Sequence, residues 1–232
     1  MNAPLDRPLH DPLLESLGLD HGFGQRGTAA PADCAFPRQV HGIDVHEVAS
    51  AEAPAVAAGT EADAIVTRVP GTSVGIVTAD CVPILVASRD GARVGAIHAG
   101  WRGLAVGVIE AGVAAVLDGM DPAGCVAAIG PAARSCCYEV DEPVRTGLAE
   151  RYSEQLEGVL VPGRPDRFQL DLPLLAERVL NQVGVESQRI GTEACLCTIC
   201  GSDRFESYRR EGAAAGRLRH FITRPEAIPR QG

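Results

Sequence analysis

The sequence contains no lysine, so all 21 of its basic residues are arginine. This absence excludes a lysine Schiff base and a phosphate-binding P-loop lysine. Acidic residues outnumber the basic ones, 30 to 21, and give a net charge of -9. Binding to nucleic acid or to an anionic membrane surface needs a basic face, so neither partner is expected.

Long hydrophobic runs are also missing, since none approaches the roughly 18 residues that a membrane span requires. The first residues, MNAPLDRPLHDPLLESLGLD, lack the basic segment followed by an apolar segment that is typical of a signal peptide. We therefore expect a cytoplasmic location. In that compartment the eight cysteines would be reduced thiols or metal ligands rather than disulfides.

Short apolar runs separated by turns dominate the first half of the sequence and predict β-strands. No helix is predicted between these strands, which favours an antiparallel or mixed sheet over repeated βαβ units. These strands cover residues 36–40, 43–48, 62–67, 73–78, 82–87 and 93–98, and a seventh strand at 125–129 follows a predicted helix.

Helices are predicted in four places. Residues 104–117 are apolar nearly all round and indicate a buried helix that ends before Gly119. The segments 142–152 and 172–182 are amphipathic, and a short helical patch at 12–17 interrupts an N-terminal segment, 1–35, that is otherwise expected to be irregular. We divide the chain into that segment and one α+β catalytic domain over residues 36–232.

Three residues at predicted strand ends could bind a metal: His41, Cys81 and His98. Two imidazoles and a thiolate form a three-ligand zinc set with an open fourth position, the form of a catalytic site. The same set also suits copper. The spacings are long, so on the residues alone the alternatives remain ordinary core histidines and a small buried cysteine.

The stretch Gly100-Trp101-Arg102-Gly103 lies between a predicted strand and a predicted helix. Free backbone N–H groups and a guanidinium at this point could form a cradle for phosphate or another anion. The alternative is a glycine-rich turn whose tryptophan packs into the core.

The C-terminal third contains a Cys-x-x-Cys pair, Cys197 and Cys200, which resembles half of a structural zinc site. No second pair follows it, so we expect no closed four-ligand site, and a redox role is the alternative. Cys136 and Cys137 are expected to be structural thiols. Residues 207–210 bring together a hydroxyl, a phenol and two arginines. These side chains could form a binding site, or they could be a charged face exposed to solvent.

Three motifs, Gln-Val-His-Gly at 39–42, Ala-Asp-Cys-Val-Pro at 79–83 and His-Ala-Gly-Trp-Arg-Gly at 98–103, resemble in this order the signature motifs of the YfiH-like family. Members are variously called laccase-domain proteins, multicopper polyphenol oxidases, peptidoglycan editing factors and purine nucleoside phosphorylases. Weaker matches occur at 62–67, 130–131, 138–140, 197–198, 207–210 and 216–217.

This resemblance implies an αββα sandwich of two mixed sheets flanked by helices, and a metal held by His41, Cys81 and His98. It also implies phosphorolysis of adenosine, inosine and methylthioadenosine, deamination of adenosine, and a homodimer. Three departures concern the pocket: the segment 24–38 is shorter than in the family, Glu206 replaces a phenylalanine, and Ala215 replaces a threonine.

From the chemistry of these side chains we expect zinc as the cofactor, with copper as the alternative. The resemblance implies purine nucleosides and phosphate as the substrates. The catalytic residues would be Cys81, Asp80, Arg102 and Glu139, with either carboxylate moving the proton to the departing purine. Phosphate and substrate would be bound by Gly100, Arg102, Arg209 and Arg210.

Other functions remain open at this point. Six histidines are too few for a four-copper oxidase, and a single-copper polyphenol oxidase would have only Met1 or Met120 as an axial ligand. Cys81 could instead be the nucleophile of an amide hydrolase that edits peptidoglycan precursors. The metal could also stiffen a protein that only binds partners. The usual zinc-deaminase signature is absent.

Overall fold

A computed structural model describes residues 7–50 and 54–227 of the chain. Its largest sheet has six strands in the order β11-β7-β5-β6-β3-β2. The β2/β3 and β11/β7 pairs are parallel and the others antiparallel, so this sheet is mixed. The strands are β2 (Val45–Val48), β3 (Ala64–Thr67), β5 (Val82–Ser88), β6 (Val94–Ala99), β7 (Cys125–Ile129) and β11 (Ile190–Gly191). Five of them were predicted, with ends that differ by no more than two residues.

A second, antiparallel sheet has the order β1-β12-β4, with β1 at His21–Gly22, β4 at Ser73–Thr78 and β12 at Leu218–Thr223. The strand predicted for 36–40 is wrong. Only isolated bridges occur there, at Ala35 and Arg38, because Pro37 has no N–H to donate to a ladder. The N-terminal segment is also less irregular than expected, since it contributes β1 as well as helix α1 (Pro12–Ser16).

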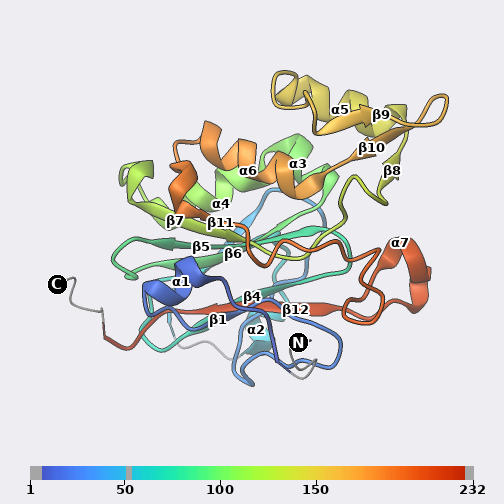
Figure 1. The fold of residues 1–232 in the computed structure, drawn as a ribbon. Helices are drawn as coiled ribbons and strands as arrows, with labels where there is room; N and C mark the ends of the chain where they lie inside the picture. Colours follow the sequence, from blue (N-terminus) through green and yellow to red (C-terminus); the bar gives the residue numbers. More distant parts are fainter. Residues whose placement is uncertain (1–6, 51–53, 228–232) are drawn as a thin grey trace.

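A third sheet, β8-β10-β9, projects from the main body together with helix α5 (Figure 1). Its strands are β8 (Glu139–Val140), β9 (Leu160–Pro162) and β10 (Phe168–Leu170). Helices α5 (Glu142–Tyr152) and α6 (Leu172–Gln182) begin and end where the sequence predicts. The Asp171 carboxylate caps α6 by accepting the N–H of Leu174, a contact that fixes the start of the helix.

The single helix predicted for 104–117 is wrong. The chain instead forms α3 (Trp101–Val106) and α4 (Val108–Leu117), with Gly107 between them at φ 97°. Glycine adopts this left-handed conformation without steric cost, and its N–H caps α3 by donating to the carbonyls of Gly103 and Leu104. The remaining helices are α2 (Pro54–Ala58), α7 (Tyr208–Glu211) and short 3-10 turns at Pro122–Gly124, Ser187–Arg189 and Gly212–Ala214.

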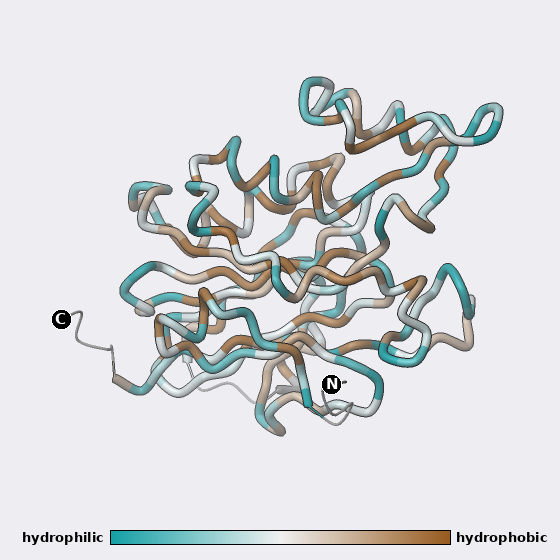
Figure 2. The backbone as a smooth tube through the Cα atoms, viewed as in Figure 1, coloured by the Kyte–Doolittle hydropathy of each residue, from teal (hydrophilic) through white to brown (hydrophobic). Residues whose placement is uncertain are grey.

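Two apolar cores separate the layers. Helices α3, α4 and α6 lie on one face of the six-stranded sheet, and the β1-β12-β4 sheet lies on the other (Figure 1). Alternate residues of β5 face the two cores: Ile84 packs with the helices and Leu85 with the smaller sheet. Both faces of the strands are therefore buried, which explains their continuous apolar runs, brown in Figure 2.

The α+β fold is confirmed, with the third sheet as an addition to the expected sandwich. Leu14 and Phe23 are fully buried in the core between the sheets, so the N-terminal segment packs against the rest. The division of the chain at residue 35 stays a prediction. Within the described residues no helix is long and apolar enough to cross a membrane.

Candidate active site

One edge of the six-stranded sheet gathers the residues that the sequence singled out. Strand β6 is antiparallel to both of its neighbours, with Ala99 opposite Val82 and Ile97 opposite Ala64. The end of β6 therefore lies beside the starts of β5 and β3. This pairing places His98 next to Cys81, which precedes β5, and next to Asp63, which precedes β3.

His41, Cys81 and His98 form a compact donor group, since one ligand atom of each lies within 4.8 Å of the others. The Cys81 Sγ and the His41 Nε2 are 3.9 Å apart. Tetrahedral zinc with ordinary Zn–S and Zn–N bond lengths would separate two such atoms by roughly 3.6 Å. The three side chains therefore fit a metal ion, and the predicted ligands are brought together.

Asp63 organises this group, although we did not predict it as a site residue. Its buried carboxylate accepts the Nδ1–H of His98 at 2.7 Å. It also accepts the backbone N–H groups of Val40, His41 and Gly42 at 2.6–3.1 Å. The first bond leaves Nε2 of His98 free for a metal, and the others hold His41 at φ 61°. Such partners fix the tautomer and orientation of metal-binding histidines.

The electrostatics of the three residues favour a thiolate. Burial alone would raise the pKa of Cys81, but His98 and His41 beside it lower the pKa to about 6. Burial likewise opposes the charged form of His98, yet Cys81 and Asp63 raise its pKa to about 9. Cys81 is therefore a thiolate at neutral pH, which is the form that binds metals and attacks electrophiles.

Gly100 makes room for the donor group. A Cβ atom at this position would lie 2.9 Å from the Sγ of Cys81 and 3.0 Å from the Cδ2 of His41. Any larger residue would push these ligands apart. We predicted Gly100 as a substrate-binding residue, and that role stays a prediction.

A cavity of about 670 Å³ opens beside the donor group. This volume is within the usual range for a small-molecule site. Its lining includes the predicted residues His41, Asp80, Cys81, His98, Arg102 and Arg209, together with Gln39, Trp101, Tyr138, Leu172, Tyr208 and Arg217, which we did not assign to the site.

Two arginines in the cavity wall are stacked on aromatic rings. The guanidinium of Arg102 lies 4.6 Å from the centre of the Trp101 ring, and that of Arg209 lies 4.6 Å from the Tyr138 ring. Within the described part of the chain, neither forms an ion pair with a carboxylate. Their charge is therefore available to an anion in the cavity.

The two predicted proton carriers are differently placed. Asp80 lies in the cavity wall, but its buried carboxylate accepts hydrogen bonds from the Thr198 and Ser207 hydroxyls and the Arg209 N–H. Glu139 is outside the lining, and its hydrogen bonds with Arg164 lower its pKa. Asp80 directly precedes Cys81, so these hydrogen bonds connect the C-terminal segment to the part of the chain that carries Cys81.

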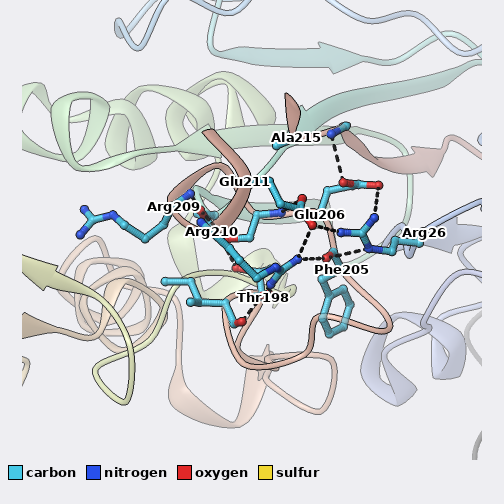
Figure 3. A network of polar contacts seen from close by, with 12 residues as sticks. Arg26, Thr198, Phe205, Glu206, Arg209, Arg210, Glu211 and Ala215 are labelled. Atoms are coloured by element: carbon cyan, nitrogen blue, oxygen red, sulfur yellow. Dashed lines mark hydrogen bonds and ion pairs between the residues drawn. The ribbon is translucent and has the colours of Figure 1, made fainter. Parts of the chain in front are cut away.

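Arg210 is directed away from the cavity. Its guanidinium donates to the backbone carbonyls of Thr198, Ile199 and Phe205, as seen in part in Figure 3. Arg209 points in another direction in the same view. Arg210 therefore orders the backbone around α7, and its predicted contact with phosphate would have to break these bonds.

Glu206, one of the departures from the family pattern, pairs with Arg26 and accepts the N–H of Gly216 (Figure 3). It thereby connects the N-terminal segment to the loop that leads to Arg217. Arg217, the residue after Gly216, lines the cavity.

A larger hollow of about 890 Å³ is lined by residues 28–32 and neighbours that include Cys34 and Arg219. Burial raises the pKa of the Cys34 thiol to about 12. A neutral thiol is a poor nucleophile and a poor metal ligand. The chemistry therefore points to the smaller cavity with Cys81.

The family model described as multi-copper polyphenol oxidoreductase laccase matches residues 23–225. The chain belongs to this family. The purine nucleoside phosphorylase of Xylella fastidiosa (strain 9a5c) is 40% identical over 200 residues, which are 86% of this chain and 71% of the relative. The purine nucleoside phosphorylase YfiH of Escherichia coli K12 is 35% identical over 192 residues, covering 83% and 74%.

Two solved structures have the same fold. The Bacillus licheniformis hypothetical protein YfiH matches with a TM-score of 0.77 at 30% identity, over 82% of this chain and 74% of the other. YlmD from Geobacillus stearothermophilus matches with a TM-score of 0.75 at 30% identity, over 84% and 74%. The resemblance to the YfiH-like family is confirmed.

Proposed function

We propose that this family member is a metal-dependent purine nucleoside phosphorylase that acts on adenosine, inosine and methylthioadenosine and also deaminates adenosine. The names of its relatives support nucleosides and phosphate as substrates. The observation that carries the proposal is a Cys-His-His donor group at the wall of a cavity that also presents the guanidinium groups of Arg102 and Arg209, neither of which is ion-paired with a carboxylate of the described residues. An oxidase needs no such phosphate-binding charge.

In the proposed reaction a phosphate oxygen forms a bond to C1′ of the ribose while the glycosidic C–N bond breaks and its electron pair leaves with the purine. Arg102 and Arg209 would bind and orient the phosphate. A zinc ion held by His41, Cys81 and His98 would supply Lewis-acid polarisation of a bound oxygen or ring atom. The two arginine side chains, rather than the helix N-terminus, would bind the phosphate. Helix α3 has only six residues, so its dipole is correspondingly weak.

The departing purine needs a proton or a hydrogen bond. Asp80 is the predicted carboxylate that lines the cavity, although three donors hold it. Burial raises the pKa of Tyr138 to about 12, so its phenol stays protonated and can donate. We therefore propose that Tyr138 contributes to substrate binding beside Asp80, while Glu139 acts only through the hydrogen bond that Arg209 donates to its carbonyl.

Zinc is proposed over copper for a structural reason. Met120, the one methionine in the described part of the chain, is 42% exposed and does not line the cavity. Met1 lies outside the described residues. A blue-copper site usually adds a weak axial methionine or a similar ligand to its two histidines and cysteine.

The decisive experiment measures phosphate-dependent release of adenine from adenosine by purified protein of known metal content, beside Cys81→Ala. Turnover that requires phosphate and about one active-site zinc per chain, and that is lost in the variant, would support the proposal. Failure to release adenine from a metal-loaded, folded protein would refute it.

A cysteine amide hydrolase is the second candidate, because the pKa of Cys81 is lowered to about 6 by two histidines. A metal-bound thiolate is a weaker nucleophile, so the two functions respond oppositely to chelation. Cell-wall peptide cleavage that increases when the metal is removed would favour the hydrolase.

The homodimer and the cytoplasmic location also remain proposals. Val40, Ile43 and Val106 are 41–48% exposed, and the close approach of Gly42 to Gly103 places their segments side by side. An exposed apolar patch of this kind suits an interface between two copies. Sedimentation equilibrium tests this, and a monomer at micromolar concentration would refute it.

A further inference from the structure

Four cysteines outside the active site converge at one point. Cys136 and Cys137 belong to the loop after β7, and Cys197 and Cys200 belong to the segment after β11. All four Sγ atoms lie within 4.8 Å of one another. The Cys137–Cys200 and Cys136–Cys200 sulfur pairs are 2.9 and 3.4 Å apart. The expectation of no four-ligand site overlooked that the second pair lies 64 residues upstream rather than downstream.

We propose that these four cysteines form a second, structural metal site that binds zinc. Four thiolates around one zinc ion stand at the corners of a tetrahedron with edges of about 3.8 Å. The observed group has this size. It also has the closed donor set of a structural site, with no fourth position left for substrate.

A disulfide explains the arrangement less well. A disulfide joins two sulfurs about 2.05 Å apart and does not require any other thiol nearby. Here Cys200 approaches both Cys136 and Cys137, and Cys197 completes the group. The remaining cysteines, Cys34, Cys81, Cys125 and Cys195, lie outside this group.

The backbone holds the two cysteine segments together independently of the thiols. Ala132 and Cys197 form a parallel bridge, in which Ala132 donates to the carbonyl of Leu196 and accepts the N–H of Thr198. The N–H of Cys137 donates to the Arg134 carbonyl, and the N–H of Gly201 donates to the Cys197 carbonyl. Such preorganisation reduces the entropy that a metal must overcome when it binds.

The site connects to the cavity through neighbouring residues. Tyr138 follows Cys137 directly and lines the cavity. Thr198 follows Cys197 and donates to the carboxylate of Asp80 at 2.6 Å, next to Cys81. A metal at the four cysteines would therefore fix the wall of the cavity without touching the substrate, which makes its ligands positioning residues.

Metal content distinguishes this site from the active-site metal. We expect about two zinc ions per chain in the wild type and about one in a His41→Ala/His98→Ala variant, which leaves the four cysteines intact. Cys197→Ser should lose about one ion. Cys195→Ser is the matched control, because Cys195 lies on the same segment but outside the group, and it should keep both ions.

Two further measurements keep the proposal testable if Cys197→Ser does not fold. Cobalt(II) bound to the His41→Ala/His98→Ala variant should show intense thiolate charge-transfer absorption, which should weaken when the exposed Cys136 is also replaced by serine. Thiol titration of the unreduced, denatured wild type should find all eight cysteines free, these four included. Absence of tightly bound zinc from the His41→Ala/His98→Ala variant, or oxidised sulfurs in the titration, would overturn the proposal. Neither result depends on phosphorylase activity.

Discussion

Asp63→Asn tests whether one buried carboxylate assembles the active-site ligands. Asp63 is fully buried and accepts four hydrogen bonds, one from the Nδ1–H of His98 and three from backbone N–H groups of residues 40–42. Asparagine has the same shape but only one acceptor oxygen. With its NH₂ group toward Val40 and Gly42, the amide faces two backbone donors. In the other orientation it faces the His41 N–H and the His98 ring, and the ring can accept from it only by changing tautomer, which places a proton on the Nε2 that would bind the metal.

The expected cost follows from the one or two donors that lose their acceptor. Each buried donor left unpaired costs about 1–3 kcal/mol, so the free energy of unfolding should fall by about 1–6 kcal/mol. Loss of the carboxylate partner of a ligating histidine typically lowers metal affinity about 10- to 100-fold. Both effects should occur together, because the same carboxylate holds the loop of His41 and the ring of His98.

The assay is urea unfolding of the metal-free protein, together with chelator competition for zinc. Asp44→Asn is the matched control, because Asp44 lies in the neighbouring loop and its side chain is exposed. The reasoning is refuted if Asp63→Asn unfolds at the wild-type urea concentration and binds zinc as tightly as the wild type.

Three other outcomes follow from the structure. Gly100→Ala should weaken zinc binding in chelator competition, because the Cβ of the new alanine would lie 2.9 Å from the Cys81 sulfur. Gly124→Ala is the control and should bind zinc as the wild type does, because the space around Gly124 is open. Replacing Arg102 or Arg209 by glutamine should raise the KM for phosphate about 10- to 100-fold in initial-rate assays, and an unchanged KM would contradict their role. Burial lowers the pKa of His220 to about 3. The unfolded state therefore binds a proton at a higher pH than the folded state. As the pH falls from 7 to 4, the free energy of unfolding measured in urea should decrease with a slope that approaches one proton. If the wild type and His220→Gln show the same pH dependence, His220 is not buried in its neutral form.

The fold was predictable where the signal is local. Apolar runs and turn residues located β4 to β7, and amphipathic spacing located α5 and α6. Strand β1 escaped prediction because two residues show no periodicity. The break at Gly107 escaped because a glycine in an apolar helix is often tolerated, and the left-handed turn depends on packing.

The site was predictable in part for a similar reason. His41, Cys81 and His98 stand in distinctive motifs at strand ends, and antiparallel pairing brings such ends together. Asp63 was missed because its role depends on hydrogen bonds to residues 40–42, which sequence spacing does not reveal. The four-cysteine group joins two distant segments, so local motif spacing pointed away from it.

The strand order β1-β12-β4 has a consequence for synthesis on the ribosome. Leu218–Thr223, the last strand along the described residues, occupies the middle of the small sheet, so β1 and β4 have no partner in that sheet until it emerges. Until then the nascent chain exposes one edge of β4 and part of the apolar core between the sheets. Exposed edges and apolar surface of this kind promote aggregation. Chains terminated before residue 218 should therefore depend on chaperones to stay dispersed, even though every residue proposed as a metal ligand has already been made.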